Sequence, residues 1–488
     1  MNKIIITLLI SCFFIFDLSA QTIQDALRYS RLQSGGTARS ISTGGALSAF
    51  GGDFGTLSAN PAGIATYRRS ELIITPSLNF SKTGSRFAET DFSNNRTNIN
   101  LSNLGLVFSK VDNSSDWKSV NLGIGMNRLT NNNQEFYYEG ITQGTIAERW
   151  QTLANGNLPD DLNAFEEAIA YEAGILYQFG NTPADEYLID PDGTDFVKKE
   201  QTVIRSGSVN DLNLTLGGNY RHKLYVGVTL GMPIVKFEET KDYTETDEFD
   251  ISPEFNSLDF DEFFSTTGIG FNAKLGIIYR VNQNFRLGAA VHTPTFFNLS
   301  DQYYTTIVSN LTLGGTTETY QAESPVSNFS YNLVSPWRAV GSLGFMFGKY
   351  GFISGDIEFI NYGSAQFNFE TDQSFEQYLN TKLKDNFNSA VNLRVGGEAR
   401  YGVFAVRAGA GYLMSPYQDL YEGADEGMFN LSMGIGLREK NLFIDLGIAR
   451  NMYSETYSPY TVPNKTEQVE VLNTITKTQF VGSIGFKF

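Results

Sequence analysis

The sequence is poor in the residues that metal centres and thiol enzymes require. Among 488 residues it has one cysteine, Cys12, and two histidines, His222 and His292. Cys12 lies in a segment that we expect to be removed, so disulfide bonds, cysteine-ligated metals and thiol catalysis are excluded for the mature chain. Two isolated histidines give poor support for a zinc site or a haem pocket. We therefore expect no metal, no cofactor and no catalytic residue.

The chain also lacks long apolar runs outside its first 20 residues, which predict a secretory signal peptide. Lys3 supplies positive charge, residues 4–16 form an apolar run, and Leu18-Ser19-Ala20 fits a small-residue cleavage site. A membrane anchor needs about 20 apolar residues, and the apolar run continues past Cys12, which argues against lipidation there. Without a later membrane helix, a membrane-spanning form must be a closed barrel, because lipid cannot satisfy open strand edges.

Positive charge and proline are scarce as well. The 36 basic residues face 53 acidic ones, giving a net charge of −17, the opposite of the basic footprint that nucleic acids require. With only 13 prolines, no proline- or serine-rich linker divides the chain, whereas glycine (47) and aromatic residues (14%) are abundant. Acidic loops would suit a lipopolysaccharide surface bridged by divalent cations.

Stretches of about ten residues that alternate apolar with small or polar side chains recur along the chain, as in membrane barrels. In the last of them, Phe480, Ile484, Phe486 and Phe488 alternate with Val481, Ser483, Gly485 and Lys487. The second set holds the charge and most of the small residues, whereas a soluble sandwich would turn its apolar set inward. Short turns, such as residues 221–223 and 439–441, alternate with long polar loops. The terminal Phe488 resembles the insertion signal of bacterial outer-membrane barrels.

The pattern predicts an all-β, transmembrane antiparallel barrel of fourteen strands with both ends in the periplasm. The strands are expected near residues 70–81, 99–110, 118–130, 199–221, 223–238, 266–280, 285–299, 328–347, 350–366, 389–401, 402–414, 428–438, 441–452 and 475–488. Residues 168–179 could form a further strand. The spacing of Leu162, Phe165, Ile169 and Ala173 instead favours a helix before them, so we place residues 131–198 outside as a partly helical extracellular excursion.

A barrel of this width needs filling, because it approaches the porins, whose lumen is an open channel. Residues 21–69 precede the first strand and contain a possible helix at 23–32, then glycine-rich stretches with interspersed apolar residues. A flexible leader is the alternative, but disordered tails rarely hold so many apolar residues. We predict a signal peptide at 1–20, an N-terminal plug at 21–69 and a β-barrel at 70–488.

The plug segment carries a family resemblance. The sequence from Gly44 to Asp53, GGALSAFGGD, followed by Leu57-Ser58-Ala59-Asn60-Pro61-Ala62-Gly63, resembles the plug of the FadL/OMPP1/TodX family of outer-membrane transport proteins. The Asn-Pro-Ala core is the signature of that family. Ser335-Pro336-Trp337-Arg338 and residues 355–362 are similar to one of its strand pairs. The chain resembles a Bacteroidetes-type member.

The resemblance implies uptake of hydrophobic compounds, typically long-chain fatty acids or aromatic hydrocarbons, across the outer membrane of a Gram-negative bacterium. The substrate would pass from an extracellular groove to an internal pocket and leave through a lateral gap, for which the third strand around 123–127 is a positional candidate. The turn at Asn60, Pro61 and Ala62 would help to gate that exit, although an ordinary surface turn uses the same Asn-Pro pair. Phe50 and Phe54 would either line the substrate pocket or anchor the plug.

Inward-facing charges are expected to pair with one another and with the plug, since buried ions need partners. They are Lys274, Arg280, Arg286, Arg338, Asp356, Glu358, Arg394, Glu398, Arg400 and Arg407. One of the arginines could instead bind a substrate carboxylate, and His292 is expected to make an ordinary polar contact.

The expected partners are hydrophobic small molecules, outer-membrane lipid and lipopolysaccharide, with the protein as a monomer. A general porin, and a scaffold or shuttle component of type IX protein secretion, remain as alternative functions. An outer-membrane enzyme is disfavoured because neither histidine lies in a recognisable catalytic motif. A TonB-dependent receptor, with 22 strands and a folded plug domain, would need a longer chain.

Overall fold

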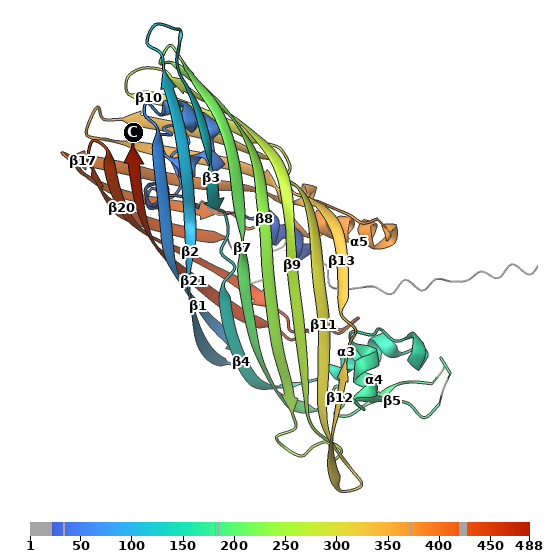
Figure 1. Ribbon diagram of the computed structural model, residues 1–488. Helices are drawn as coiled ribbons and strands as arrows, with labels where there is room; N and C mark the ends of the chain where they lie inside the picture. Colours follow the sequence, from blue (N-terminus) through green and yellow to red (C-terminus); the bar gives the residue numbers. More distant parts are fainter. Residues whose placement is uncertain (1–21, 33–34, 181, 184, 371, 419–426) are drawn as a thin grey trace, which may run out of the picture.

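A computed structural model describes residues 22–488, apart from 33–34, 181, 184, 371 and 419–426. The predicted signal peptide lies outside the described residues. Most of the chain forms one antiparallel sheet that closes on itself (Figure 1). Closure comes from the first and last strands, since Glu71 pairs with Lys487 and Leu72 with Phe486.

Among the described residues, the sheet contains nineteen strand segments, which occupy fourteen positions in the wall because five segments continue a broken strand. In order around the barrel they are β1 (Glu71–Phe87), β2 (Thr90–Val111), β3 (Trp117–Arg128) continued by β4 (Gln134–Gln143), β7 (Phe196–Tyr220), β8 (Leu224–Thr246), β9 (Phe255–Arg280), β10 (Phe285–His292) continued by β11 (Phe296–Leu313), β14 (Arg338–Met346) with β13 (Ser327–Val334) and β12 (Thr316–Glu323), β15 (Gly351–Asn361) continued by β16 (Gln366–Asn368), β17 (Ser389–Tyr401), β18 (Phe404–Leu413), β19 (Met428–Arg438), β20 (Leu442–Tyr457) and β21 (Val471–Lys487). The predicted class and strand number are confirmed.

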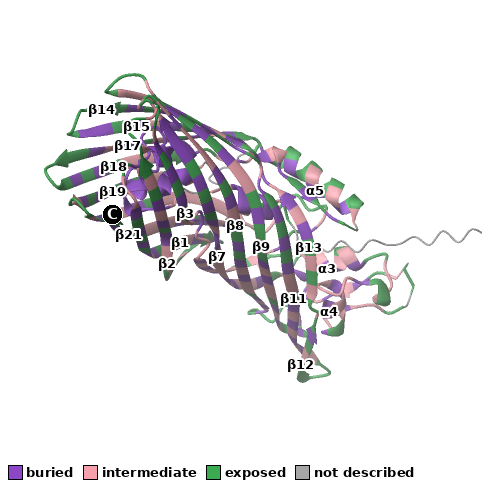
Figure 2. Ribbon diagram, turned by 45° about the horizontal axis from the view of Figure 1, so that its top comes forward, coloured by how far each residue is buried: buried purple, intermediate pink, exposed green. Residues whose placement is uncertain are grey.

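The outer surface of the barrel is apolar. On β21 the side chains of Phe480, Ile484 and Phe486 are exposed, whereas Val481 and Ser483 are buried. The same alternation runs along neighbouring strands (Figure 2), and Met433 on β19 is 63% exposed. A soluble protein rarely exposes so large a continuous apolar surface, whereas a barrel in lipid turns its apolar set outward. The fold is a transmembrane β-barrel.

Short turns lie at one end of the barrel and long connections at the other. Arg221 and His222 form a tight turn with positive φ angles, and the Phe488 amide donates to the Ser70 carbonyl at 3.0 Å, so both ends of the barrel chain share the short-turn end. At the long-loop end lie α3 (Ala147–Ala154), η3 (Pro159–Asp161), α4 (Glu167–Glu172), β5 (Leu176–Tyr177), β6 (Leu188–Ile189), η4 (Tyr362–Ser364) and α5 (Gln373–Asn386). Among the described residues, no helix is long and apolar enough to cross a membrane.

Several strands extend further than the sequence predicts. Residues 134–143, expected to lie in a loop, form β4, which pairs with β7. The extended ends of β8, β9 and β11 pair with their neighbours and, with α3 and α4, surround an apolar cluster that includes Trp150. A prediction from apolar alternation alone places the ends of these strands too early. Beyond the bilayer both faces of a strand contact protein or water instead of lipid, so the alternation stops while the strand continues.

The N-terminal segment, residues 22–69, lies inside the ring of strands (blue in Figure 1). It contains α1 (Ile23–Ser30), α2 (Ala38–Ser42), η1 (Phe54–Ser58) and η2 (Pro61–Thr66). Helix α2 contacts β18 to β21, whereas η2 contacts β3, β7, β8 and β9. Helix α1 packs on α5 through a cluster that includes Leu27 and Leu379. The segment therefore touches the wall on several sides of the lumen.

Candidate functional site

The turn at Asn60 is fastened both to the N-terminal segment and to the wall. Its side-chain Oδ1 accepts the Ala62 amide at 3.0 Å, which caps η2. Its Nδ2 donates to the Ser48 carbonyl at 2.9 Å and to the Ile277 carbonyl of β9 at 3.2 Å. Pro61 occupies the first helical position, where its missing N–H costs nothing. One buried side chain thus joins two parts of the N-terminal segment and one wall strand.

Glycines in the wall make room for this turn. A Cβ at Gly227 of β8 would lie 2.7 Å from the Ala62 amide nitrogen, and one at Gly276 of β9 would lie 3.0 Å from Cδ of Pro61. The distance at Gly227 is too short for a real Cβ, and a Cβ at Gly276 would also overlap Oδ1 of Asn60. The backbones of η2 and the two strands therefore approach as only glycine permits. The sequence shows these glycines at inward positions, but not which part of the N-terminal segment they receive.

The two candidate phenylalanines lie in different surroundings. Phe54 is fully buried, and its ring covers Gly105 of β2 and Gly123 and Gly125 of β3. Phe50 packs on Phe352 with ring centroids 4.4 Å apart, and the Arg286 guanidinium lies 5.3 Å from its ring centroid. The placement of Phe54 favours anchoring over lining of a pocket, whereas Phe50 borders a cavity at the short-turn end.

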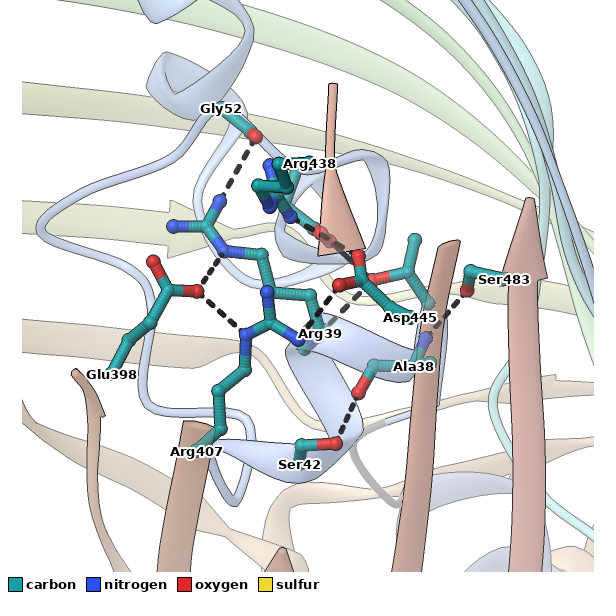
Figure 3. A network of polar contacts seen from close by, with 12 residues as sticks. Ala38, Arg39, Ser42, Gly52, Glu398, Arg407, Arg438, Asp445 and Ser483 are labelled. Atoms are coloured by element: carbon teal, nitrogen blue, oxygen red, sulfur yellow. Dashed lines mark hydrogen bonds and ion pairs between the residues drawn. The ribbon is translucent and has the colours of Figure 1, made fainter. Parts of the chain in front are cut away.

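A chain of buried ions joins the N-terminal segment to the wall (Figure 3). Arg39 of α2 donates to Glu398 of β17 at 2.9 Å and to the Gly52 carbonyl at 3.1 Å. Glu398 also accepts from Arg407 of β18 at 2.6 Å, and Arg407 pairs with Asp445 of β20 at 2.8 Å. Asp445 in turn pairs with Arg438. These ions are buried, so removing one of them would leave its partner as an uncompensated buried charge, which is strongly destabilising.

Other inward charges pair as the sequence predicts. Lys274 contacts Asp211 at 2.6 Å, and Glu358 contacts Arg394 at 2.6 Å and Arg338 at 3.3 Å. His292 donates from Nε2 to the Ala59 carbonyl at 2.8 Å, an ordinary polar contact with the N-terminal segment. Three members of the predicted set make no ion pair among the described residues. Asp356 accepts the Ser48 amide of the N-terminal segment at 3.2 Å, and two arginines also bond to neutral groups. Arg280 donates to the Asn282 carbonyl, and Arg286 donates to the Phe50 carbonyl.

The wall is interrupted beside β2. The ladder between β2 and β3 covers Asn103 to Val111 of β2, whereas β1 pairs with β2 from Thr90 onward. At residues 129–133 the regular strand stops on the β2 side, although the Leu129 and Asn132 amides still donate to the Val209 and Gly207 carbonyls of β7. The strand resumes as β4, which pairs with β7. Within the part of the chain that the structure describes, no ladder joins β4 to residues 90–102 of β2. The positional candidate at 123–127 lies inside the intact ladder, directly before this wall break.

Side chains, instead of a backbone ladder, cross the wall break. Asn131 donates from Nδ2 to Oδ1 of Asn98 at 3.2 Å, and the Tyr137 amide donates to Oδ1 of Asn94 at 3.2 Å. The N-terminal segment contacts the strands below the break. Ser102 donates to the Gly36 carbonyl at 3.0 Å, and Asn127 donates to Oγ of Ser58 at 2.8 Å. The wall break is therefore held by few bonds, next to a segment that is not part of the wall.

A cavity of about 740 Å³ lies in the lumen towards the long loops. Its lining includes Thr130, Asn131 and Asn132 of the wall break, together with Leu27, Phe237 and Met428. Basic side chains also border it. Arg205 pairs with Glu239 and Glu455, whereas Lys477 donates to the Asn131 carbonyl at 3.0 Å. Among the described residues, no group of three or more His, Cys, Asp or Glu side chains is placed to hold a metal.

No family model and no curated protein matches the sequence. Solved structures do match the fold over nearly the whole chain. A Pseudomonas aeruginosa FadL homologue aligns with a TM-score of 0.57 at 11% identity, covering 94% of this chain and 99% of that one. The chain has the FadL fold. The Ralstonia pickettii toluene transporter TbuX aligns with a TM-score of 0.51 at 15% identity, and the P. putida toluene transporter TodX with 0.50 at 13%, each covering 93% of this chain and 99% of the other.

At these identities the FadL fold is what the likeness establishes. It confirms at the level of the fold the resemblance that the Asn60-Pro61-Ala62 motif indicates. Sequence reasoning identified the motif but missed the wall break at residues 129–133. A signal for the break was available in the run Thr130-Asn131-Asn132-Asn133, where the apolar alternation of the third strand stops.

Proposed function

We propose that this protein is an outer-membrane transporter that takes up hydrophobic small molecules and releases them sideways into the bilayer. The observation that carries the proposal is the wall break between β2 and β4, which adjoins both the lumenal cavity and the N-terminal segment. The FadL fold, the apolar outer belt and the predicted signal peptide support an outer-membrane location.

A lateral exit suits a hydrophobic substrate, because the way straight through the lumen ends in water. Moving an apolar molecule from protein to lipid avoids the free-energy cost of hydrating its surface, about 25 cal/mol per Å². The outer ends of the break open onto exposed apolar side chains such as Ile99, which is 79% exposed. The route thus leads from a partly apolar cavity to lipid without an intervening aqueous step.

The basic lining of the cavity favours an amphiphile with an acidic head, such as a long-chain fatty acid. Lys477 lies at the wall break, and its Nζ contacts the Asn131 carbonyl. A carboxylate held there would place its alkyl chain near Leu27 and Phe237. Toluene, the compound named for TbuX and TodX, has no head group that would use a cation. Both classes are therefore compared in the test below.

We further propose that the N-terminal segment gates the exit. Gly35 lies so close to the Arg128 carbonyl that a Cβ on it would overlap the oxygen, and Gly36 accepts from Ser102. The contacts of Asn60 and Phe54 hold the same segment against β2, β3, β8 and β9. Withdrawal of the segment would remove the inner support of the wall break, which side chains alone then keep closed.

The test closes the wall break with a disulfide. Asn98→Cys and Asn131→Cys replace two side chains that touch across the break, in a chain whose one natural cysteine lies in the predicted signal peptide. The matched control, Asn298→Cys with Asn332→Cys, joins a register pair within a continuous ladder. Uptake of radiolabelled long-chain fatty acid and of toluene is measured in cells that lack their own transporter, before and after reduction.

We expect the cross-linked break to lose most uptake and to regain it on reduction, with the control unaffected. Unchanged uptake through the cross-linked break would reject lateral exit. A large ion conductance in planar bilayers, unaltered by the cross-link, would instead support the general porin. If the cross-link abolished uptake of fatty acid but not of toluene, the route would be selective for molecules with an acidic head group. If it abolished uptake of both compounds, the route would serve hydrophobic molecules in general.

A further inference from the structure

A second cavity, of about 430 Å³, lies at the short-turn end beneath the N-terminal segment. We call it the basic pocket, because eight of its lining residues are cationic: Arg39, Arg68, Arg69, Arg286, Lys349, Arg400, Arg438 and Lys487. No aspartate or glutamate is among the lining residues. Its lining comes from both parts of the molecule, since Phe50, Gly51 and Gly52 belong to the N-terminal segment whereas Phe352 and Met346 belong to the wall.

Carboxylates behind the lining neutralise only part of this charge. Arg39 and Arg400 share Glu398, Arg438 pairs with Asp445, and Lys487 lies 3.5 Å from Glu71. The remaining described contacts are to neutral groups.

Three of the cations make only such neutral contacts. Arg69 donates to the carbonyls of Lys440 and Lys487, Arg286 to the Phe50 carbonyl, and Lys349 lies over the ring of Tyr350. The pocket thus keeps an excess of positive charge in a chain whose net charge is −17.

The hydrogen-bonding capacity of the basic pocket is also unfilled. Nε of Arg286 and Nε of Arg438 are buried and have no hydrogen-bond partner among the described residues. A guanidinium group presents its donors in a planar fork that matches the oxygens of a phosphate or carboxylate. The cations that line the pocket repel one another, and a bound anion would offset this repulsion. Space, charge and free donors therefore all fit an oxyanion.

We propose that the basic pocket binds a small, multiply charged oxyanion, a phosphate-bearing solute, that enters from the water at the short-turn end. The ligand comes from solution and not from the lipid, because the lining side chains face the lumen while their neighbours, such as Phe345 and Phe486, face outward. Arg39, Gly51 and Gly52 on one side and Arg286 on the other would then share one anion. Binding holds the N-terminal segment against the wall.

This inference is independent of what the barrel transports. The sequence predicts both ends of the barrel in the periplasm, and both lie at the short-turn end. The anion therefore acts from the side opposite to substrate entry. Its binding stabilises the position of the N-terminal segment in which the wall break is supported from inside.

The experiment measures binding of inorganic phosphate and of glycerol phosphate to the full barrel in an uncharged maltoside detergent, by titration calorimetry at low salt. Arg286→Gln combined with Lys349→Gln removes two pocket cations that lie outside the buried ion chain. Arg221→Gln with Lys118→Gln is the matched control, because it removes two basic charges at the same end of the barrel but outside the pocket. Arg68→Gln with Arg69→Gln is a second pocket variant, should the first fail to fold.

We expect either pocket variant to weaken phosphate binding by about tenfold or more, since each loses charge-assisted hydrogen bonds or close attraction to the anion. The control should change it by less than about twofold, because exposed charges are screened. Phosphate should also slow amide exchange of residues 50–69 in the wild-type protein and not in the pocket variant. Absent binding, or equal weakening in the control, would overturn the proposal. The same exchange measurement is made in bilayers of anionic phospholipid without added phosphate. If residues 50–69 were protected there but not by phosphate in detergent, the proposal would also be overturned, because the ligand would then be a lipid head group.

Discussion

The ring of Phe54 occupies the space that a side chain at Gly105 would need. A Cβ built on Gly105 of β2 would lie 2.5 Å from Cδ2 of that ring. Phe54 comes from η1 and Gly105 from the wall beside the wall break, so this contact sets how closely the N-terminal segment approaches β2. A side chain at Gly105 therefore fits only if the Phe54 ring or the backbone moves.

Replacing Gly105 with alanine should therefore push the N-terminal segment away from the wall. We expect a loss of about 1–3 kcal/mol in the stability of the segment, the usual range for overpacking a filled site. Hydrogen exchange of residues 54–66, followed by mass spectrometry, would measure it. Gly355→Ala on β15 is the control, since the nearest heavy atom to its Cβ would be 3.8 Å away. Equal exchange in the two variants would refute the role of this contact.

Asn60→Ala should loosen the turn without unfolding the barrel. The substitution removes the cap of η2 and leaves the Ser48 and Ile277 carbonyls without their donor. Losses of this kind cost about 1–3 kcal/mol. We expect faster amide exchange of residues 48–62 and altered substrate uptake. Asn282→Ala removes a comparable turn-capping asparagine from the wall, and should leave the N-terminal segment unchanged. An Asn60→Ala variant with wild-type exchange would show that the turn is held by its glycine cradle alone.

Arg407→Met should destabilise the barrel as a whole. Arg407 is fully buried and contacts both Glu398 and Asp445, so its removal leaves two carboxylates short of a partner. Breaking a buried pair typically costs about 3–5 kcal/mol, which should lower the urea midpoint of unfolding in lipid vesicles. The exposed pair of Arg221 and Asp116 offers the contrast, because Arg221→Met should change stability by less than about 1 kcal/mol. If both variants unfold at the same urea concentration, the ion chain is not a stabilising link.

The helical part of the long-loop end should become less stable as pH rises. Glu167 of α4 is 5% exposed, and its Oε2 has no hydrogen-bond partner among the described residues. Burial, reinforced by the neighbouring charge of Glu166, raises the pKa of Glu167 to about 7 from the ordinary 4.5. A raised carboxyl pKa means that the folded state binds the proton more tightly. The stability this supplies is complete below pH 4.5 and is lost as pH rises through about 7.

The full effect is on the order of 3 kcal/mol. Limited proteolysis of residues 147–176 at pH 5 and pH 8 would detect it as faster cleavage at the higher pH. Glu167→Gln mimics the protonated side chain, so this variant should resist cleavage at both values. A variant with the same pH dependence as the wild type would assign the effect to another group.

The class of the fold can be read from the sequence, because the physical rule behind it is local. Alternation at a period of two decides which face of a strand is apolar. It places Phe480, Ile484 and Phe486 on the outward face, where the structure has them exposed. The fourteen positions of the wall follow from the same alternation and from short turns such as residues 221–223. The content of residues 21–69, rich in glycine yet partly apolar, likewise predicts a segment that packs against other backbone.

Which distant residues meet follows from the folded barrel and not from any local pattern. Examples are the bond of Asn60 to Ile277, the contact of Phe54 with Gly105, and the ion pair of Arg39 with Glu398. These contacts depend on the register and curvature of the strands, and the first and last join residues more than two hundred positions apart. No local sequence pattern encodes them. The wall break at residues 129–133 depends on pairing between strands, since an edge is open only when its neighbour turns away. The basic pocket is a further case, because its eight cations are scattered from Arg39 to Lys487 and gather only when the barrel closes around the N-terminal segment.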